Sequence, residues 1–227
     1  MKKIYYITAV FATLFLVGCG DGIDLPGVNV ETDLNKIPLP DNNVNLEQVE
    51  LKPSTEPMLH EGLHTEEDFQ RIRDKKAAGE EPWVSAYQLL VESQFSQKTA
   101  DTYPTEWIKR GISGDENYMN AARGATIVYQ QALRWKIEQD DEYAAKAVEN
   151  LNKWVQTCVG VTGNTNLSLA AGLYGYEFAI AGELLRDYGG WDRADFAAFQ
   201  NWLLKVFYPA NDDFLKRHHD TNALHYW

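Results

Sequence analysis

The sequence has little cysteine: among its 227 residues only Cys19 and Cys158 carry a thiol. Small secreted domains with thin cores are instead rich in disulfides. Cys158 lies in a helical pattern with Trp154, Val155 and Val159, and this apolar neighbourhood favours a buried structural thiol over a nucleophile. Packing must therefore stabilise the folded part, and a chain of this length can bury a sizeable core.

Positive charge is also scarce. The chain has 21 Lys and Arg against 33 Asp and Glu, which gives a formal net charge of −12 and a pI near 4.8. An acidic chain of this kind argues against nucleic acid as a partner. It still allows a polyanionic sugar as a partner, provided that Arg and Lys cluster locally.

The apolar run from Ile4 to Val17 is too short to cross a membrane, which takes roughly 20 residues, but it suits a signal-peptide core behind Lys2 and Lys3. It ends in Leu16-Val17-Gly18-Cys19, which resembles the lipobox of bacterial lipoproteins; an ordinary signal peptide with a chance cysteine is the alternative. We predict removal of residues 1–18 and lipidation of Cys19. The acyl chains would anchor the protein to a membrane in the periplasm or at the cell surface.

Residues 19–58 show no apolar periodicity. Asn, Gly and acidic residues fill this segment, together with five of the eight prolines of the chain: Pro26, Pro38, Pro40, Pro53 and Pro57. Such a composition predicts an extended, self-repelling tether between the lipid and the folded part. We expect the folded domain to span residues 59–227.

No stretch of the folded part alternates with period two, so no strands are predicted. Thr65-Glu66-Glu67-Asp68 matches a capping box, Gly79 is a natural helix stop, and Pro82 suits the start of a helix that runs from Trp83 to about Gln97. Four further helices follow from apolar stripes at helical spacing, over Ala121–Trp135, Ala144–Val155, Leu169–Leu184 and Phe196–Phe207. The predicted fold class is all-α.

A weak internal repeat relates these helices. A shift of about 49 residues places Ala121 on Ala170, Tyr129 on Phe178 and Ala132 on Ala181. Each unit pairs a long apolar helix with a shorter amphipathic one, and such αα-hairpins stack into an open solenoid or close into an (α/α) toroid. The aromatic content suits a carbohydrate-binding cleft, although most of these rings are expected to fill helix interfaces.

The last twelve residues, 216–227, hold three of the five histidines. On a helix, His218, Asn222 and His225 share one face. Two His and an Asn without a nearby carboxylate form a poor zinc site, and we expect neither a metal nor another cofactor.

Cleavage of a uronic-acid polymer by β-elimination offers these residues a better use. One group must neutralise the carboxylate, a base must remove the C5 proton, and an acid must protonate the leaving oxygen on C4. Asn222, His225 and Tyr226 are side chains of the required types, close together, and are our candidate catalytic residues. A surface helix that happens to carry them is the alternative.

Several segments resemble alginate-lyase-like (α/α) toroid proteins. His60–Phe69 and Gly79–Trp83 are similar to the opening of these proteins, Asn166–Tyr188 to one of their inner helices, and Asn222–Trp227 to the start of their catalytic helix. The resemblance covers residue 59 to the end. It implies a toroid fold and lyase activity on an anionic polysaccharide such as alginate.

The catalytic run departs from the family pattern at one place. Better-known alginate lyases carry Asn-Asn-His-Ser-Tyr-Trp, whereas this chain reads Asn-Ala-Leu-His-Tyr-Trp, so Leu224 occupies the position of the catalytic His. His225 lies one residue later, which turns a helical side chain by about 100°. His218 and His219 therefore remain alternatives for the catalytic role.

Asn164 and Asn166 precede an inner helix where the resemblance implies sugar-binding residues, and Arg217 could supply the positive charge that an anionic substrate needs. The other candidate substrate contacts are His218, His219 and Trp227. The two asparagines could instead cap a helix, and Arg217 could complement a helix end. Arg123 and Arg134, on a repeat helix, are predicted to be structural.

Three questions stay open at the level of sequence. The chain stops at Trp227 in mid-pattern, and the family would place a tyrosine acid later; the chain alone is therefore expected to be an incomplete domain with little activity. A glycoside hydrolase on the same toroid would need paired carboxylates, and none is recognisable. A non-catalytic sugar-binding lipoprotein would explain the tether and the aromatics without a catalytic tyrosine.

Overall fold

The computed structural model describes residues 63–218. The predicted signal peptide with Cys19, the tether, and the candidates His219, Asn222, His225, Tyr226 and Trp227 lie outside the described residues. The elements in chain order are α2 (Glu66–Ala77), α3 (Trp83–Glu92), the 3-10 helix η3 (Gln94–Ser96), β1 (Trp107–Arg110), α4 (Tyr118–Glu138), α5 (Asp141–Thr157), β2 (Gly160–Gly163), α6 (Asn166–Leu185), α7 (Arg193–Val206) and α8 (Tyr208–His218).

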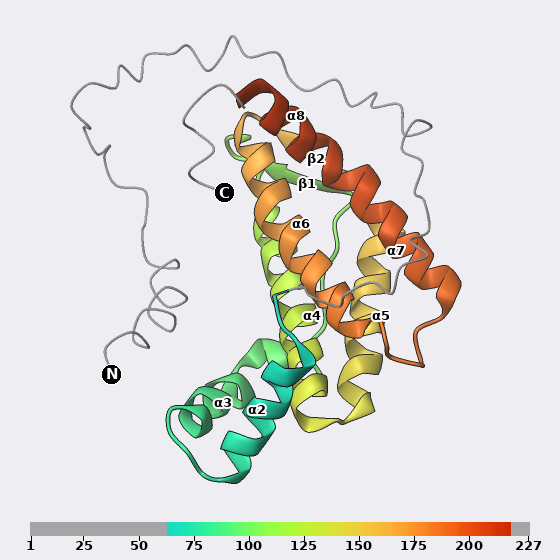
Figure 1. Ribbon diagram of the computed structural model, residues 1–227. Coiled ribbons are helices and arrows are strands. Elements are labelled where there is room, and N and C mark those ends of the chain that lie inside the picture. The colour runs from blue at the N-terminus through green and yellow to red at the C-terminus, as the bar shows by residue number, and fades with distance from the viewer. Residues whose placement is uncertain (1–62, 219–227) are drawn as a thin grey trace, which may run out of the picture. The chain divides into compact units, whose positions relative to one another are not determined.

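Two αα-hairpins, α4–α5 and α6–α7, form the body of this part of the chain, so the predicted all-α class and the hairpin repeat are confirmed (Figure 1). α4 packs along both α5 and α6. Tyr118, the first residue of α4, stacks on Tyr174 in the middle of α6, and Thr126 bonds Glu177 further along both helices, so α4 and α6 run parallel. α2 and α3 lie at the carboxyl end of α4, and α8 packs on α6 and α7.

Local signals placed the helix starts correctly. The capping box forms as predicted: Thr65 Oγ1 accepts from Asp68 N at 3.2 Å, and the Asp68 carboxylate accepts from Thr65 N at 3.0 Å. Gly79 follows the end of α2 with φ +70°, a conformation that favours glycine. The helix from Trp83 ends at Glu92, five residues before the predicted end, because extended Ser93 caps η3 with its own side chain.

The prediction of no strands was wrong. β1 and β2 form a short parallel pair in which Trp107 aligns with Gly160 and Arg110 with Gly163. Gly163 has φ +150° and leaves no room for a Cβ against the Arg110 carbonyl, so a side chain there would break the pairing. Four-residue strands with glycines at both ends of β2 carry too little alternation to be seen in sequence.

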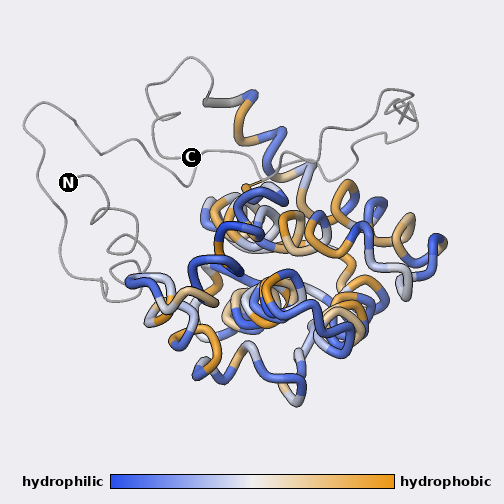
Figure 2. The backbone as a smooth tube through the Cα atoms, turned by 60° about the horizontal axis from the view of Figure 1, so that its bottom comes forward, coloured by the Kyte–Doolittle hydropathy of each residue, from blue (hydrophilic) through white to orange (hydrophobic). Residues whose placement is uncertain are grey.

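Aromatic side chains fill the core between the hairpins. Phe178 is fully buried, with ring centroids 5.5 Å from Trp154, 5.2 Å from Trp202 and 6.1 Å from Phe207. Figure 2 shows polar and apolar residues on different sides of the helices, as amphipathic packing requires. Cys158 is buried as predicted, and burial raises the pKa of its thiol to about 11.

The buried face of α6 differs from the expected one. Leu173 and Tyr176, on the predicted stripe, are 48% and 58% exposed, whereas Tyr174 and Phe178 point into the core. α6 is apolar nearly all round, so its composition could not decide which side packs against α4 and α8. Within residues 63–218 no helix is both long and apolar enough to span a bilayer.

Candidate functional site

The amino ends of α4 and α6 meet at the β1–β2 pair, because each strand leads into one of these helices. Arg110 is the last residue of β1 and Gly163 the last of β2. Polar groups from both connections therefore gather at one end of the parallel helices. Three of the residues that matter here, Asn164, Asn166 and Arg110, lie within three residues of a strand end or a helix start.

Asn164 precedes Thr165, the N-cap residue of α6, and its side chain bonds the first residue of the helix. Its side-chain oxygen accepts from Asn166 N at 2.9 Å, and its carbonyl accepts from Leu167 N at 2.9 Å. The same side chain packs against Gly111, which has φ +81° and no room for a Cβ. Asn166 begins α6 and is exposed, so its amide remains accessible to a ligand.

Arg110 is held between two tyrosines from the parallel helices. Its Nη1 donates to Tyr174 Oη at 3.1 Å, and its guanidinium lies 4.6 Å from the centroid of the Tyr118 ring. The two tyrosine rings stack with centroids 6.5 Å apart and planes 6° apart. The arginine is thereby oriented by β1, α4 and α6 together.

The carboxylates next to Arg110 in sequence are directed elsewhere. Asp115 pairs with Lys109 at 2.7 Å, and Glu116 accepts from Gly111 N. Among residues 63–218, Arg110 has no carboxylate partner. Most of its five N–H donors thus remain for a ligand, and a guanidinium suits a planar carboxylate.

Burial keeps the neighbouring phenol protonated. Burial is the main cause that raises the pKa of Tyr174 to about 12, although Arg110 opposes the shift. At neutral pH the Tyr174 hydroxyl is therefore a hydrogen-bond donor and acceptor without charge. It can accept from Arg110 while its own proton stays available.

A second polar cluster lies further along the same face of α4. Tyr118 and Tyr129 are eleven residues apart, which is close to three helical turns. His64 Nε2 lies 2.5 Å from Tyr129 Oη, and burial together with the nearby Glu177 raises the pKa of Tyr129 to about 12. Burial lowers the pKa of His64, with Asp68 opposing.

Glu177 is the acidic member of this cluster. Burial between α4 and α6 raises its pKa to about 7, despite a hydrogen bond with Thr126 that favours ionisation. A carboxyl that titrates near neutrality is typical of functional sites, although structural burial produces the same shift. α6 is largely apolar and carries two acidic residues, Glu177 and Glu183, and a carboxyl in the middle of such a helix is the sequence signal that could have identified Glu177.

The sequence analysis also missed Arg110 and Tyr174, because no local pattern connects the end of a four-residue strand to the middle of a helix 64 residues later. Arg217 and His218 lie at the end of α8, where the structure describes the backbone and not the side chains. In the described range, residues 63–218, no three His, Cys, Asp or Glu side chains are grouped so as to hold a metal ion.

Arg134 has the structural role predicted for it, since it is buried and bonds Ser96, Glu138 and Tyr143. Arg123 does not share that role. It is exposed and, among residues 63–218, has no hydrogen-bond or ion-pair partner.

Two parallel inner helices, each followed by an antiparallel outer helix, are consistent with the (α/α) toroid class. The sequence model of the alginate lyase family matches residues 72–227, from within α2 to the last residue, and the chain belongs to this family. No curated protein and no solved structure gives a significant match. Family membership implies a polysaccharide lyase.

Proposed function

We propose that the protein cleaves a uronic-acid polymer of the alginate type by β-elimination. Membership of the alginate lyase family supports the reaction class. The observation that carries the substrate class is Arg110, a guanidinium without a carboxylate partner in the described range, held by Tyr118 and Tyr174 in an acidic protein. Such a group binds a sugar carboxylate and has no comparable use toward a neutral glucan.

Arg110 would act on the first step of the reaction. When donors neutralise the uronate carboxylate, the proton on C5 becomes more acidic, because the negative charge that develops on removal is shared with the carboxylate. A base then takes the C5 proton, the electron pair forms the C4–C5 double bond, and the C4–O bond breaks. An acid gives a proton to the leaving oxygen, so atoms and charge balance.

The remaining roles rest on the sequence motif. Asn222 would share carboxylate neutralisation with Arg110, His225 would remove the proton, and Tyr226 would act near the leaving oxygen. His218 and His219 stay as alternatives for the base, since Leu224 occupies the usual position. Asn166, Arg217 and Trp227 would contact neighbouring sugars.

The test is a lyase assay on the full-length protein with alginate, glucuronan and hyaluronan, following the ultraviolet absorbance of the unsaturated uronate. Arg110→Gln is expected to lower kcat/KM about 100-fold, the effect of removing one charged donor from a developing anion. Arg193→Gln, at the exposed start of α7, is the control and should leave the rate unchanged. Absence of product from all three polymers in a folded protein would refute the lyase and favour the polysaccharide-binding lipoprotein.

We also propose that lipid on Cys19 anchors the protein, with residues 19–58 as the tether. The Val17-Gly18-Cys19 run behind a short apolar stretch supports this proposal. Cys19→Ser should move the protein from the membrane fraction to the soluble fraction of the native host. A variant that stays membrane-bound would contradict a lipid anchor at this residue.

A further inference from the structure

A pocket of about 310 Å³ lies between the segment 94–103 and α4. This volume falls at the lower end of the roughly 300–1,000 Å³ typical of small-ligand sites. Asn120, Arg123, Gly124 and Ile127 form its α4 wall. The pocket is separate from the Arg110 site, because the residues of the two sites lie on different faces of α4.

The two sites lie on opposite sides of α4. At 100° per residue, Tyr118 and Tyr129 fall within about 20° of each other, whereas Asn120, Arg123 and Ile127 lie between about 140° and 200° from Tyr118. A helix with its side chains is about 10–12 Å across. A ligand in the pocket is therefore separated from the Arg110 site by the full width of α4.

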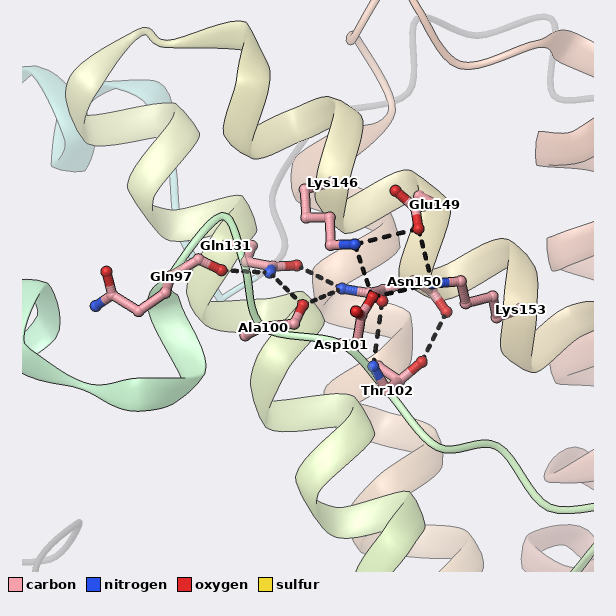
Figure 3. Close-up of polar contacts among 9 residues, drawn as sticks. All are labelled: Gln97, Ala100, Asp101, Thr102, Gln131, Lys146, Glu149, Asn150 and Lys153. Atoms are coloured by element: carbon pink, nitrogen blue, oxygen red, sulfur yellow. Dashed lines mark hydrogen bonds and ion pairs between the residues drawn. The ribbon is translucent and has the colours of Figure 1, made fainter.

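The wall opposite α4 is the loop 94–103, and buried side-chain amides from α4 and α5 hold it in place (Figure 3). Asn150 Nδ2 donates to the Ala100 carbonyl at 2.9 Å, and Asn150 Oδ1 accepts from Thr102 N at 3.2 Å. Gln131 Nε2 donates to the carbonyls of Gln97 and Ala100 at 2.9 and 3.1 Å. Asn150 and Gln131 are fully buried and bonded to each other, so they hold the loop in one conformation.

The acidic residue of the pocket is already neutralised. Asp101 pairs with Lys146 at 2.7 Å and with Lys153 at 3.0 Å, and both lysines also pair with Glu149 (Figure 3). Hydrogen bonds from the two lysines hold the pKa of Asp101 below its usual value. These four charges sum to zero, which leaves Arg123 to set the sign of the pocket.

The accessible groups of the pocket match an anionic sugar. Arg123 is exposed, and neither it nor the Asn120 side chain has a hydrogen-bond partner within residues 63–218. Tyr103, at the rim, is 75% exposed. A guanidinium for a carboxylate, an amide for hydroxyls and an aromatic face for a pyranose ring are the elements of uronate recognition.

We propose that this pocket binds a uronate unit of the polymer at a second site, separate from the Arg110 site at the amino ends of α4 and α6. Arg123 bonds the carboxylate, Asn120 bonds ring hydroxyls, and Tyr103 packs against the sugar. The proposal rests on the proposed polyuronate substrate. A second binding site keeps the polysaccharide near the Arg110 site between successive cleavages.

The test measures binding without turnover. The full-length protein carrying Arg110→Gln and Asn222→Ala, which disable the proposed catalytic site, is titrated calorimetrically with oligomannuronate and oligoguluronate that lack the unsaturated end unit. Adding Arg123→Gln is expected to weaken the residual binding about tenfold, as for one charge-assisted contact. Tyr103→Ala should weaken it severalfold, and Arg123→Lys should retain part of the affinity.

Arg193→Gln in the same background is the matched control and should change the affinity less than twofold. Equal affinities for Arg123→Gln and Arg193→Gln, no residual binding at all, or equal binding of a cello-oligosaccharide would overturn the pocket. The lyase assay on the parent protein separates the two proposals. Product formation without an Arg123 effect overturns the pocket alone, and Arg123-dependent binding without product overturns the lyase alone.

Discussion

The two hairpins share a topology and differ in what holds them together. In α4–α5 and its loop, buried amides and an arginine form hydrogen bonds: Gln131 with Asn150, and Arg134 with Tyr143. In α6–α7 and its turns the contacts are aromatic, as between Phe178 and Trp202 at 5.2 Å or Trp191 and Phe196 at 5.0 Å.

This difference matches the structural role of each hairpin. Apolar packing tolerates changes in shape and specifies little about direction, whereas buried hydrogen bonds demand one geometry. The polar hairpin, α4–α5, positions the loop that lines the pocket. The aromatic hairpin, α6–α7, provides the apolar surface against which α4 and α8 pack. A repeat can thus keep its architecture while the interior of one unit is polar and that of the next is aromatic.

Removal of the central aromatic ring should have the largest effect. Phe178→Ala deletes a fully buried ring that touches Trp154, Trp202 and Phe207, and we expect a loss of about 4 kcal/mol in the free energy of unfolding. Urea unfolding measures it. Tyr176→Ala, on the exposed side of the same helix, should cost about 0.5 kcal/mol or less. Equal losses would mean that the aromatic core does not carry this hairpin.

Glu177 is a buried carboxyl in the aromatic hairpin, and its replacement tests whether a polar group also affects the stability of that hairpin. Its pKa of about 7 in the folded state lies above the usual 4.5, so the folded protein binds the proton more tightly than the unfolded chain. Stability therefore falls as pH rises from about 4.5 to 7, by at most about 3 kcal/mol. Glu177→Gln should remove this slope, measured as the urea midpoint at several pH values.

The control for that experiment is Glu183→Gln, a change on the same helix at a carboxyl that pairs with Arg186. It should leave the pH slope between 4.5 and 7 in place. If Glu177→Gln retains the slope as well, the carboxyl is ionised in the folded state, and burial does not dominate its titration.

A smaller effect is expected from the amide network of the polar hairpin. Asn150→Ala leaves Thr102 N and Gln131 Oε1 without their partner in a buried place, which costs about 2 kcal/mol. The control Asn152→Ala lies on the same helix and loses one exposed bond to Asp195. Urea unfolding and amide exchange of residues 97–102 report the difference. If both variants lose the same stability, the loop is held by other contacts.

Much of the helical frame could be predicted because its causes are local. The capping box at Thr65, the stop at Gly79 and the period of the apolar residues in α4, α5 and α7 all act within a few residues of one another. The repeat of about 49 residues then implied that like helices pack side by side, as α4 and α6 do. The place of Arg134 on a repeat helix predicted its structural role, but its bonds to Ser96, Glu138 and Tyr143 are visible only in the tertiary structure.

The candidate site could be predicted only in part. The sequence indicates two asparagines at the start of α6, but only the tertiary structure shows that the Asn164 side chain bonds Asn166 N and that Asn166 is exposed. Arg110 was missed because its orientation depends on two tyrosines, one eight residues later and one 64 residues later. Arg123 was assigned a structural role that its exposure contradicts.

The sequence by itself determined where helices begin, how they repeat and which family the chain belongs to, because propensity, capping and periodicity are properties of neighbouring residues. Only the tertiary structure decided that Trp107 pairs with Gly160 and that Tyr174, not Leu173, faces the core. It also decided that Arg110 and Arg123 lie on opposite sides of the α4 region without a carboxylate partner in residues 63–218. These outcomes depend on which of several surfaces, distant in sequence, become buried against one another. No local sequence pattern determines that choice.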